Sequence, residues 1–325
     1  MRASLDTAGV RLDVRCEPHW AARLITEGAA GELRAPDPLA AATVRVEADR
    51  RPFDTVGWRL LTRGAWERDG ELVLTDVCTT GFDLRVTLDA DRPVFVYRWR
   101  PQPRSRAAAW ALRSRFHLLA RAALIQFPAL WWASELGRAP LHASAVETAG
   151  ATLLVAAPSG VGRSTLLVRE LEHGGRATGD NLGVSDGETV WSLVEPIRVD
   201  GGRGGRRMPH GRREMPLTRR AASLRPAAVV VLERGDSVRS ALVPCPPETA
   251  ARTLVTSTYT AGELRRFWPF AAELAAGTGR GPAHPPVAEV ASRLTAALPC
   301  WTLRLGRDGA RLGELMAAEG EPAWA

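Results

Sequence analysis

The feature that most constrains the fold is a short glycine-containing segment between an apolar run and an amphipathic run. Residues 151–157 (ATLLVAA) are almost entirely apolar, residues 158–162 (PSGVG) include two glycines, and residues 163–173 (RSTLLVRELEH) carry apolar residues at helical spacing. A short apolar run that ends at a glycine segment is typical of a buried strand, and the spacing after it predicts a helix. The sequence therefore predicts a strand, a tight loop and a helix in immediate succession.

Residues 157–165 (APSGVGRST) contain the residue types that a phosphate-binding loop requires. Small residues let backbone N–H groups point at an anion, a cation meets the phosphates, and a hydroxyl helps to hold magnesium. Against the pattern G-x-x-x-x-G-K-[ST], Gly162 and Ser164 match, whereas Ala157 replaces the first glycine and Arg163 replaces the lysine. A plain strand-to-helix turn is the alternative interpretation of this segment.

Two further blocks flank this loop. LHASAV, with His142, precedes it, and GGRATGDN, with Asp180 and Asn181, follows it. The three blocks together resemble the HPr kinase/phosphorylase family and, more closely, the HPr-kinase-related proteins, which are often encoded beside peptide-modification genes. The resemblance implies an α/β P-loop kinase core of the HPr-kinase and PEP-carboxykinase type, preceded by a smaller, mostly β N-terminal domain.

The resemblance also implies a site that binds ATP and Mg²⁺. In that site Arg163 would replace the phosphate-binding lysine, Ser164 would contact magnesium, and Asp180 would organise magnesium or accept a proton. His142 would lie near the γ-phosphate, although a hydrogen-bonded histidine at a strand start and a turn role for Asp180 are the alternatives. The residues expected to contact the nucleotide are Ala157, Pro158, Ser159, Gly160, Val161, Gly162, Arg163, Ser164 and Thr165.

Two departures from the family pattern bear on catalysis. Arginine is a broad planar fork and not a compact ammonium, so Arg163 is not a conservative replacement for lysine, although the whole chain contains no lysine. Asn181 stands where the family has a second aspartate, and an amide cannot act as a base. We therefore expect either a kinase that transfers the γ-phosphate to a Ser or Thr hydroxyl of a peptide or protein, or a degenerate pseudokinase that serves as a nucleotide-binding or structural partner.

Residues 10–99 show short alternating runs, such as VRLDV, FDLRVTL and VFVYRW, that are separated by turn residues. This pattern predicts a mostly β region, and none of its carboxylates has the spacing of a catalytic group. We expect an accessory or recognition domain over residues 1–103, a helical connector over 104–140, and the nucleotide-binding domain over 141–320. The connector includes the apolar stretch 107–136, which we expect to form a buried helix or helix pair broken near Pro128.

Residues 201–220 form a glycine- and arginine-rich segment that we expect to be a mobile loop. Its arginines could neutralise the nucleotide's phosphates, RNA or an acidic peptide, or could simply be solvated. The net charge of +7 is modest for a chain of 325 residues, and the segment lacks interleaved aromatic residues, so nucleic acid is disfavoured as a partner. Just before it, VEPIRVDGG resembles a P-x-x-L-K segment of the related proteins, with Arg198 near the lysine position, which argues against HPr as the substrate.

The remaining features favour a cytoplasmic protein. Four isolated cysteines predict free thiols, and the N-terminal residues lack the apolar stretch of a secretory signal. Arg113, Arg115 and Arg121 interrupt the most apolar stretch, which argues against a membrane span. A homo-oligomer is compatible with the resemblance, but nothing in the sequence identifies an interface.

Overall fold

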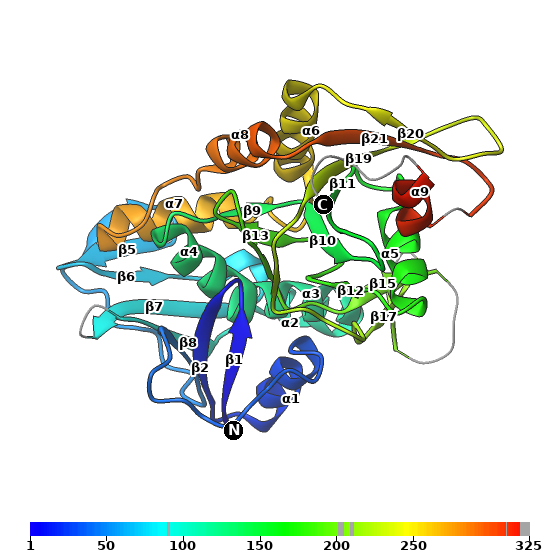
Figure 1. The fold of residues 1–325 in the computed structure, drawn as a ribbon. Coiled ribbons are helices and arrows are strands. Elements are labelled where there is room, and N and C mark those ends of the chain that lie inside the picture. The colour runs from blue at the N-terminus through cyan, green and yellow to red at the C-terminus, as the bar shows by residue number, and fades with distance from the viewer. Residues whose placement is uncertain (90–91, 201–204, 209–210, 310, 319–325) are drawn as a thin grey trace.

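The computed structural model describes residues 1–89, 92–200, 205–208, 211–309 and 311–318. In these ranges the chain is a mixed α/β protein with an N-terminal β region and several sheets (Figure 1). The first sheet has eight strands in the order β1-β2-β3-β8-β7-β6-β5-β4. Its strands are β1 (Arg2–Thr7), β2 (Val10–Cys16), β3 (Ala42–Glu47), β4 (Arg59–Thr62), β5 (Ala65–Arg68), β6 (Glu71–Leu74), β7 (Phe82–Asp89) and β8 (Arg92–Trp99).

The mostly β prediction for this region is confirmed, because alternating side chains of its strands are buried, as β3 shows along its whole length. Three elements were not foreseen: β1, β5 and helix α1 (His19–Gly28). A short 3₁₀ turn at Val77–Thr79 joins β6 to β7.

The apolar stretch after this sheet forms helices, as predicted, but the expected break near Pro128 is wrong. The expected burial is also wrong for residues 107–111, none of which is buried. Helix α2 (Pro103–Ala111) ends at Leu112, α3 (Arg113–Arg121) runs into a π-helical turn (Ala122–Gln126), and α4 (Phe127–Glu135) follows. Pro128 lies in the first turn of α4, where the missing N–H costs no helical hydrogen bond. The break between helices therefore lies at Leu112, and the backbone just before Pro128 is helical.

Helix α7 (Phe267–Thr278) connects the C-terminal half of the chain to the first sheet. It lies beside β5 and β6 (Figure 1). Its Phe267 and Phe270 pack against Phe127 of α4. The helical prediction for residues 247–276 is confirmed for α6 (Pro247–Thr260) and α7, but the break expected near Pro269 lies at residues 261–266. The first sheet and the C-terminal half thus share one hydrophobic cluster.

The second sheet has the strand order β12-β10-β11-β19-β21-β20, in which β11, β19 and β21 are parallel. One face packs on α6 and α8 (Val287–Ala297), and the other packs on α5 (Arg163–Glu172) and α9 (Leu312–Ala318). Both faces are covered, which explains the continuous apolar runs of β11 and β19. The strands are β10 (Ala143–Glu147), β11 (Thr152–Ala156), β12 (Arg176–Ala177), β19 (Ala228–Arg234), β20 (Ala241–Pro244) and β21 (Cys300–Leu305).

Two small sheets complete the described structure. One has the order β18-β14-β13-β9, and the other has the order β15-β17-β16. The second is a correction, since strands β16 and β17 lie in the segment that was expected to be a loop; residues 201–204 and 209–210 of that segment lie outside the described residues. The bounds are β9 (Ala139–Leu141), β13 (Gly183–Ser185), β14 (Val190–Ser192), β15 (Ile197–Val199), β16 (Arg206–Arg207), β17 (Arg213–Met215) and β18 (Ser223–Leu224).

Candidate functional site

The predicted strand, loop and helix are present as β11, residues 157–162 and α5. Gly160 and Gly162 have φ values of +83° and +126°, a backbone region that residues with a Cβ rarely adopt. Gly162 is the N-cap of α5, and no described side chain caps this helix end. The first helical hydrogen bond runs from the Leu166 N–H to the Gly162 carbonyl, so the N–H groups before Leu166 remain available to a ligand.

This helix end opens into a cavity of about 330 Å³. The loop residues that line it are Pro158, Ser159, Gly160, Gly162, Arg163, Ser164 and Thr165, together with His142 and Asn181. Ala157 and Val161 do not line the cavity, because Ala157 is fully buried and Val161 packs partly against the same core. The remaining lining residues are Val168, Arg169, Glu172, Arg198, Val199, Asp200 and Arg212.

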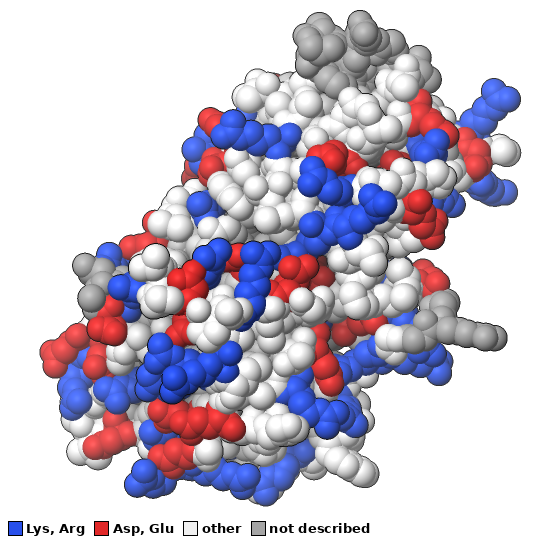
Figure 2. Space-filling model, turned by 60° about the horizontal axis from the view of Figure 1, so that its bottom comes forward, with Lys and Arg blue, Asp and Glu red and all other residues white. Residues whose placement is uncertain are grey.

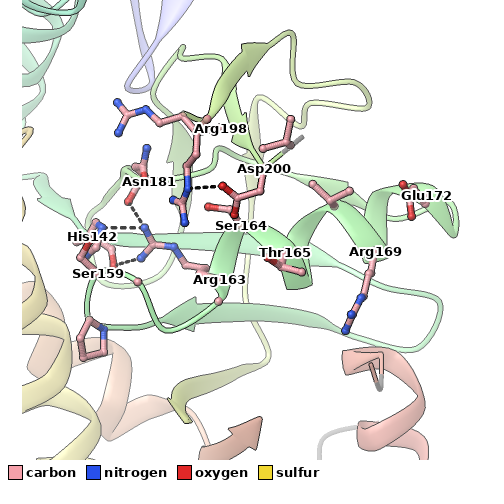
Figure 3. Close-up of a pocket in the computed structure, with 16 residues that line it drawn as sticks. His142, Ser159, Arg163, Ser164, Thr165, Arg169, Glu172, Asn181, Arg198 and Asp200 are labelled. Atoms are coloured by element: carbon pink, nitrogen blue, oxygen red, sulfur yellow. Dashed lines mark hydrogen bonds and ion pairs between the residues drawn. The ribbon is translucent and has the colours of Figure 1, made fainter. Parts of the chain in front are cut away.

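Arg163 is buried, and its guanidinium is bonded to the protein on three nitrogens. Figure 3 shows the contacts with His142 and Asn181. Nε donates to the Asp180 carbonyl at 3.1 Å, and Nη1 donates to the His142 carbonyl at 2.7 Å. Nη2 donates to the Asn181 carbonyl at 3.1 Å and lies 2.8 Å from His142 Nε2. Four of its five N–H bonds are thus engaged, and the side chain ties the start of α5 to two other segments of the chain.

His142 is held in one protonation state by this contact. A guanidinium can only donate, so His142 Nε2 accepts and the proton of the neutral ring is on Nδ1. Burial, and after it the Arg163 charge, lowers the pKa of His142 to about 3. The imidazole is therefore neutral near pH 7, and its Nε2 lone pair is already used.

Asp180 and Asn181 lie side by side but differ in access to the cavity. The Asp180 carboxylate is fully buried and is not part of the cavity lining; its Oδ2 accepts the Arg198 backbone N–H at 3.0 Å. Asn181 lines the cavity, and its backbone N–H donates to Glu195 Oε1 at 2.7 Å. Burial raises the pKa of Glu195 although the neighbouring Arg198 lowers it. The structure thus brings the predicted residues together but leaves the Asp180 carboxylate behind the cavity wall.

Several lining residues were not predicted as site residues, namely Arg169, Glu172, Arg198, Asp200 and Arg212. Arg198 donates to Glu263 Oε1 at 2.5 Å, and Arg212 donates to Asp200 Oδ1 at 3.1 Å. The resemblance of VEPIRVDGG to the P-x-x-L-K segment was the one signal for Arg198. Arg212 comes from the arginine-rich segment, which the β15–β17 pairing carries to the cavity.

The cavity is positive, with four arginines against two carboxylates in its lining. The Arg198 Nε–H and the Asn181 side-chain amide are buried donors without a partner in the described part of the chain. Leaving such buried donors unpaired costs free energy. The described residues contain no cluster of three or more His, Cys, Asp or Glu side chains that could hold a metal ion by itself.

Charges elsewhere on the surface are mixed. Figure 2 shows arginines interspersed with carboxylates over the face that it presents, without one continuous basic surface.

Within the described ranges, none of the helices has the length and apolar character needed to cross a membrane. The four cysteines are free, as predicted.

Comparison with known proteins yields no assignment: no protein-family model matches the chain, and no curated protein matches it. The resemblance to the HPr-kinase-related proteins therefore stays a prediction that depends on the three sequence blocks.

Proposed function

We propose that the chain binds the phosphates of a nucleoside triphosphate, ATP by its resemblance, through a P-loop core of the HPr-kinase and PEP-carboxykinase type. The observation that carries the proposal is the uncapped N-terminus of α5, which opens into an arginine-lined cavity. A helix N-terminus offers unpaired N–H groups and a partial positive charge, and both attract phosphate. The cavity volume of about 330 Å³ is in the usual range for small-molecule sites.

The cations that face the ligand are, in this proposal, Arg198 and Arg212 together with the exposed part of Arg169. Arg163 contributes mainly its positive charge, because four of its five N–H bonds are already engaged by backbone carbonyls and His142. Arg198 is well placed for this role: burial lowers its pKa, but Glu195 and Glu263 outweigh burial, so the pKa is raised and the charge is retained.

Magnesium fits the site through Ser164, whose residue lines the cavity in the first turn of α5. Mg²⁺ keeps several waters and is usually held by one or two carboxylates together with the phosphates, so Ser164 would supply only one of its ligands. When bound, the ion would neutralise charge on the phosphates. Asp180 would join it only if its buried carboxylate became accessible.

Binding without transfer is better supported than phosphoryl transfer. A kinase needs a base near the acceptor hydroxyl. Asp180 is buried outside the lining, Asn181 is an amide, and the Nε2 lone pair of His142 is engaged by Arg163. We therefore favour a nucleotide-binding partner in a biosynthetic complex, such as a peptide-maturation complex.

Transfer to a Ser or Thr hydroxyl is the second candidate, and one observation favours it. Asp200 lines the cavity, and its side chain is largely exposed while paired with Arg212. A carboxylate in this position could accept a hydroxyl proton once Arg212 moved to a phosphate.

The test uses a matched pair of substitutions at Gly160, whose φ of +83° both Asn and Asp tolerate better than other residues. No described atom crowds the position where a Cβ would be added. With a fluorescent ATP analogue and Mg²⁺, we expect Gly160→Asn to weaken binding slightly and Gly160→Asp to weaken it at least about tenfold, because the two differ by one negative charge beside the phosphates. Equal affinities for the two variants, or no binding by the unmodified chain, would refute nucleotide binding.

Radiolabelled ATP then separates the two candidates. Binding without transfer to any peptide hydroxyl supports the partner role, and transfer that Asp200→Asn abolishes supports the kinase.

A further inference from the structure

A second hollow lies on the N-terminal part of the molecule, away from the loop of α5. It is a groove of about 590 Å³ between α1 and the pair α2 and α3. Its apolar lining includes Trp20, Trp99, Trp110 and Phe116. Trp110 is 86% exposed, which is unusual for the largest apolar side chain.

Helix α2 forms one wall of this groove, yet none of its nine residues, all of which are described, is buried. A short helix gains most of its stability from burying one face. The apolar residues of α2 that line the groove are Ala109 and Trp110. Trp110 is therefore a large apolar side chain that the described part of the chain leaves uncovered.

We propose that this groove is a docking site for an acidic peptide segment that carries a large apolar side chain. The apolar side chain would lie against Trp110 and Phe116, and the acidic residues would face the arginines of the rim. This docking site would serve the proposed function. Only its link to the nucleotide cavity rests on that function; the groove itself does not.

The rim supplies the charge that selects an acidic segment. Arg23 of α1, Arg106 of α2 and Arg113 of α3 line the groove and are exposed. None of the three forms an ion pair with a carboxylate of the described ranges. The one acidic residue of the lining, Glu27, is already paired with Arg206. The groove thus presents three unpaired positive charges around an aromatic floor.

The sheet β15-β17-β16 connects this groove with the nucleotide cavity. On one side, Arg198 and Asp200 beside β15 line the cavity at α5. On the other side, Arg206 of β16 pairs with Glu27 of α1, and the Arg207 carbonyl accepts the Ser114 hydroxyl of α3 at 3.0 Å. A small cavity that shares Glu27 and His117 with the groove continues toward Glu214 of β17. A peptide seated in the groove could therefore extend along this sheet toward the nucleotide.

Two other occupants fit less well. A two-fold dimer would place the same patch on itself, so Arg23, Arg106 and Arg113 would face their own copies in a chain of net charge +7. Single-stranded nucleic acid needs successive free aromatic faces for stacking, but Trp20 already packs against Phe82 and Trp99, with ring centroids at 5.9 and 4.8 Å, so the exposed Trp110 could stack on one base.

The test selects a displayed library of short random peptides on the full chain without nucleotide. We expect the enriched peptides to carry an aromatic or large aliphatic residue among Asp and Glu. Their affinity, measured by fluorescence anisotropy, should fall at least about tenfold with Trp110→Ala, because a central aromatic anchor dominates such interfaces. It should also fall with the double charge reversal Arg106→Glu and Arg113→Glu.

Two exposed residues outside the groove serve as controls. Leu39, which is 83% exposed, controls for loss of an apolar surface side chain, and Arg252 on α6 controls for charge reversal. We expect Leu39→Ala and Arg252→Glu to leave peptide affinity unchanged. All the substituted side chains are exposed, so the fold should be retained, and circular dichroism checks this.

The proposal is overturned if no peptide is enriched, or if the enriched peptides bind the Trp110→Ala variant as tightly. It is equally overturned if Trp110→Ala dissociates a dimer seen by light scattering, or if it removes binding of a single-stranded oligonucleotide while peptide binding persists. Since no nucleotide is present, loss of peptide binding leaves the proposed nucleotide site standing. Loss of nucleotide binding likewise leaves the groove standing.

Discussion

Replacing Arg163 by methionine tests whether this residue acts mainly as a structural tie or as a phosphate ligand. In the structure three different guanidinium nitrogens donate to the carbonyls of His142, Asp180 and Asn181. Methionine fills a similar volume but provides no donor, so the three carbonyls would lose these bonds. The substitution thus removes the hydrogen bonds that hold the start of α5 against His142 and against residues 180–181.

The expected loss of stability follows from those three carbonyls. Leaving a buried acceptor without its partner costs about 1 to 3 kcal/mol, so leaving all three carbonyls unpaired would cost at most about 3 to 9 kcal/mol. Water can enter from the adjoining cavity, so we expect about 3 to 5 kcal/mol. For a chain of 325 residues such a loss lowers Tm by about 4 to 7 °C. Arg163→Lys keeps the charge but offers one nitrogen in place of three, and we expect it to cost about 2 kcal/mol.

Thermal unfolding followed by circular dichroism, together with titration of the fluorescent ATP analogue, gives both readouts. Arg169→Met is the matched control, since Arg169 lies on the same helix and lines the same cavity, but its side chain forms no hydrogen bond or ion pair with the described residues. We expect Arg169→Met to change Tm by no more than about 2 °C. The structural role would be refuted if Arg163→Met left Tm unchanged and abolished ATP binding while Arg163→Lys retained it. Arg163 would then be a phosphate ligand.

Two further predictions concern the loop and its neighbour. Gly162→Ala places a Cβ on a residue with φ of +126°, 3.3 Å from Leu305 Cδ1. We expect urea unfolding to show a loss of about 1 to 3 kcal/mol in the free energy of unfolding. The control Gly150→Ala adds a Cβ where no described atom lies within 4 Å, and it should leave this free energy unchanged. The pKa of His142 is lowered to about 3 in the folded chain, so between pH 6.5 and 3 the unfolded chain binds more protons. Its contribution to stability is therefore complete above about pH 6.5 and is lost as the pH falls, at up to about 1.4 kcal/mol per pH unit. Urea unfolding at several pH values should show a smaller slope for His142→Gln; an unchanged slope would contradict the assignment.

Much of the second sheet was predictable because its signals are local. The apolar runs of β11 and β19 and the helical spacing of α5 are complete within each segment. The glycines between β11 and α5 likewise marked the loop correctly. These elements needed no knowledge of their partners.

The rest depended on contacts that no local pattern encodes. An apolar helix such as α7 has the same pattern whichever sheet it packs on, so its contact with β5 and β6 was invisible in the sequence. Alignment with the family pattern placed Arg163 in the lysine position, but it did not give the direction of a longer side chain, which turns toward His142 and Asn181. Short strands such as β16 are too brief for an alternating pattern, so the sequence of the arginine-rich segment predicts a loop where the structure has strands.

Hydrogen exchange measured with and without ATP and Mg²⁺ tests the central claim most directly. Phosphates bound at the uncapped end of α5 would accept hydrogen bonds from the loop amides and slow their exchange. We predict that protection is greatest at residues 158–165 and extends to residues 198–200, which line the same cavity. Unchanged exchange in residues 158–165 at saturating ATP, or protection confined to other segments, would contradict the account.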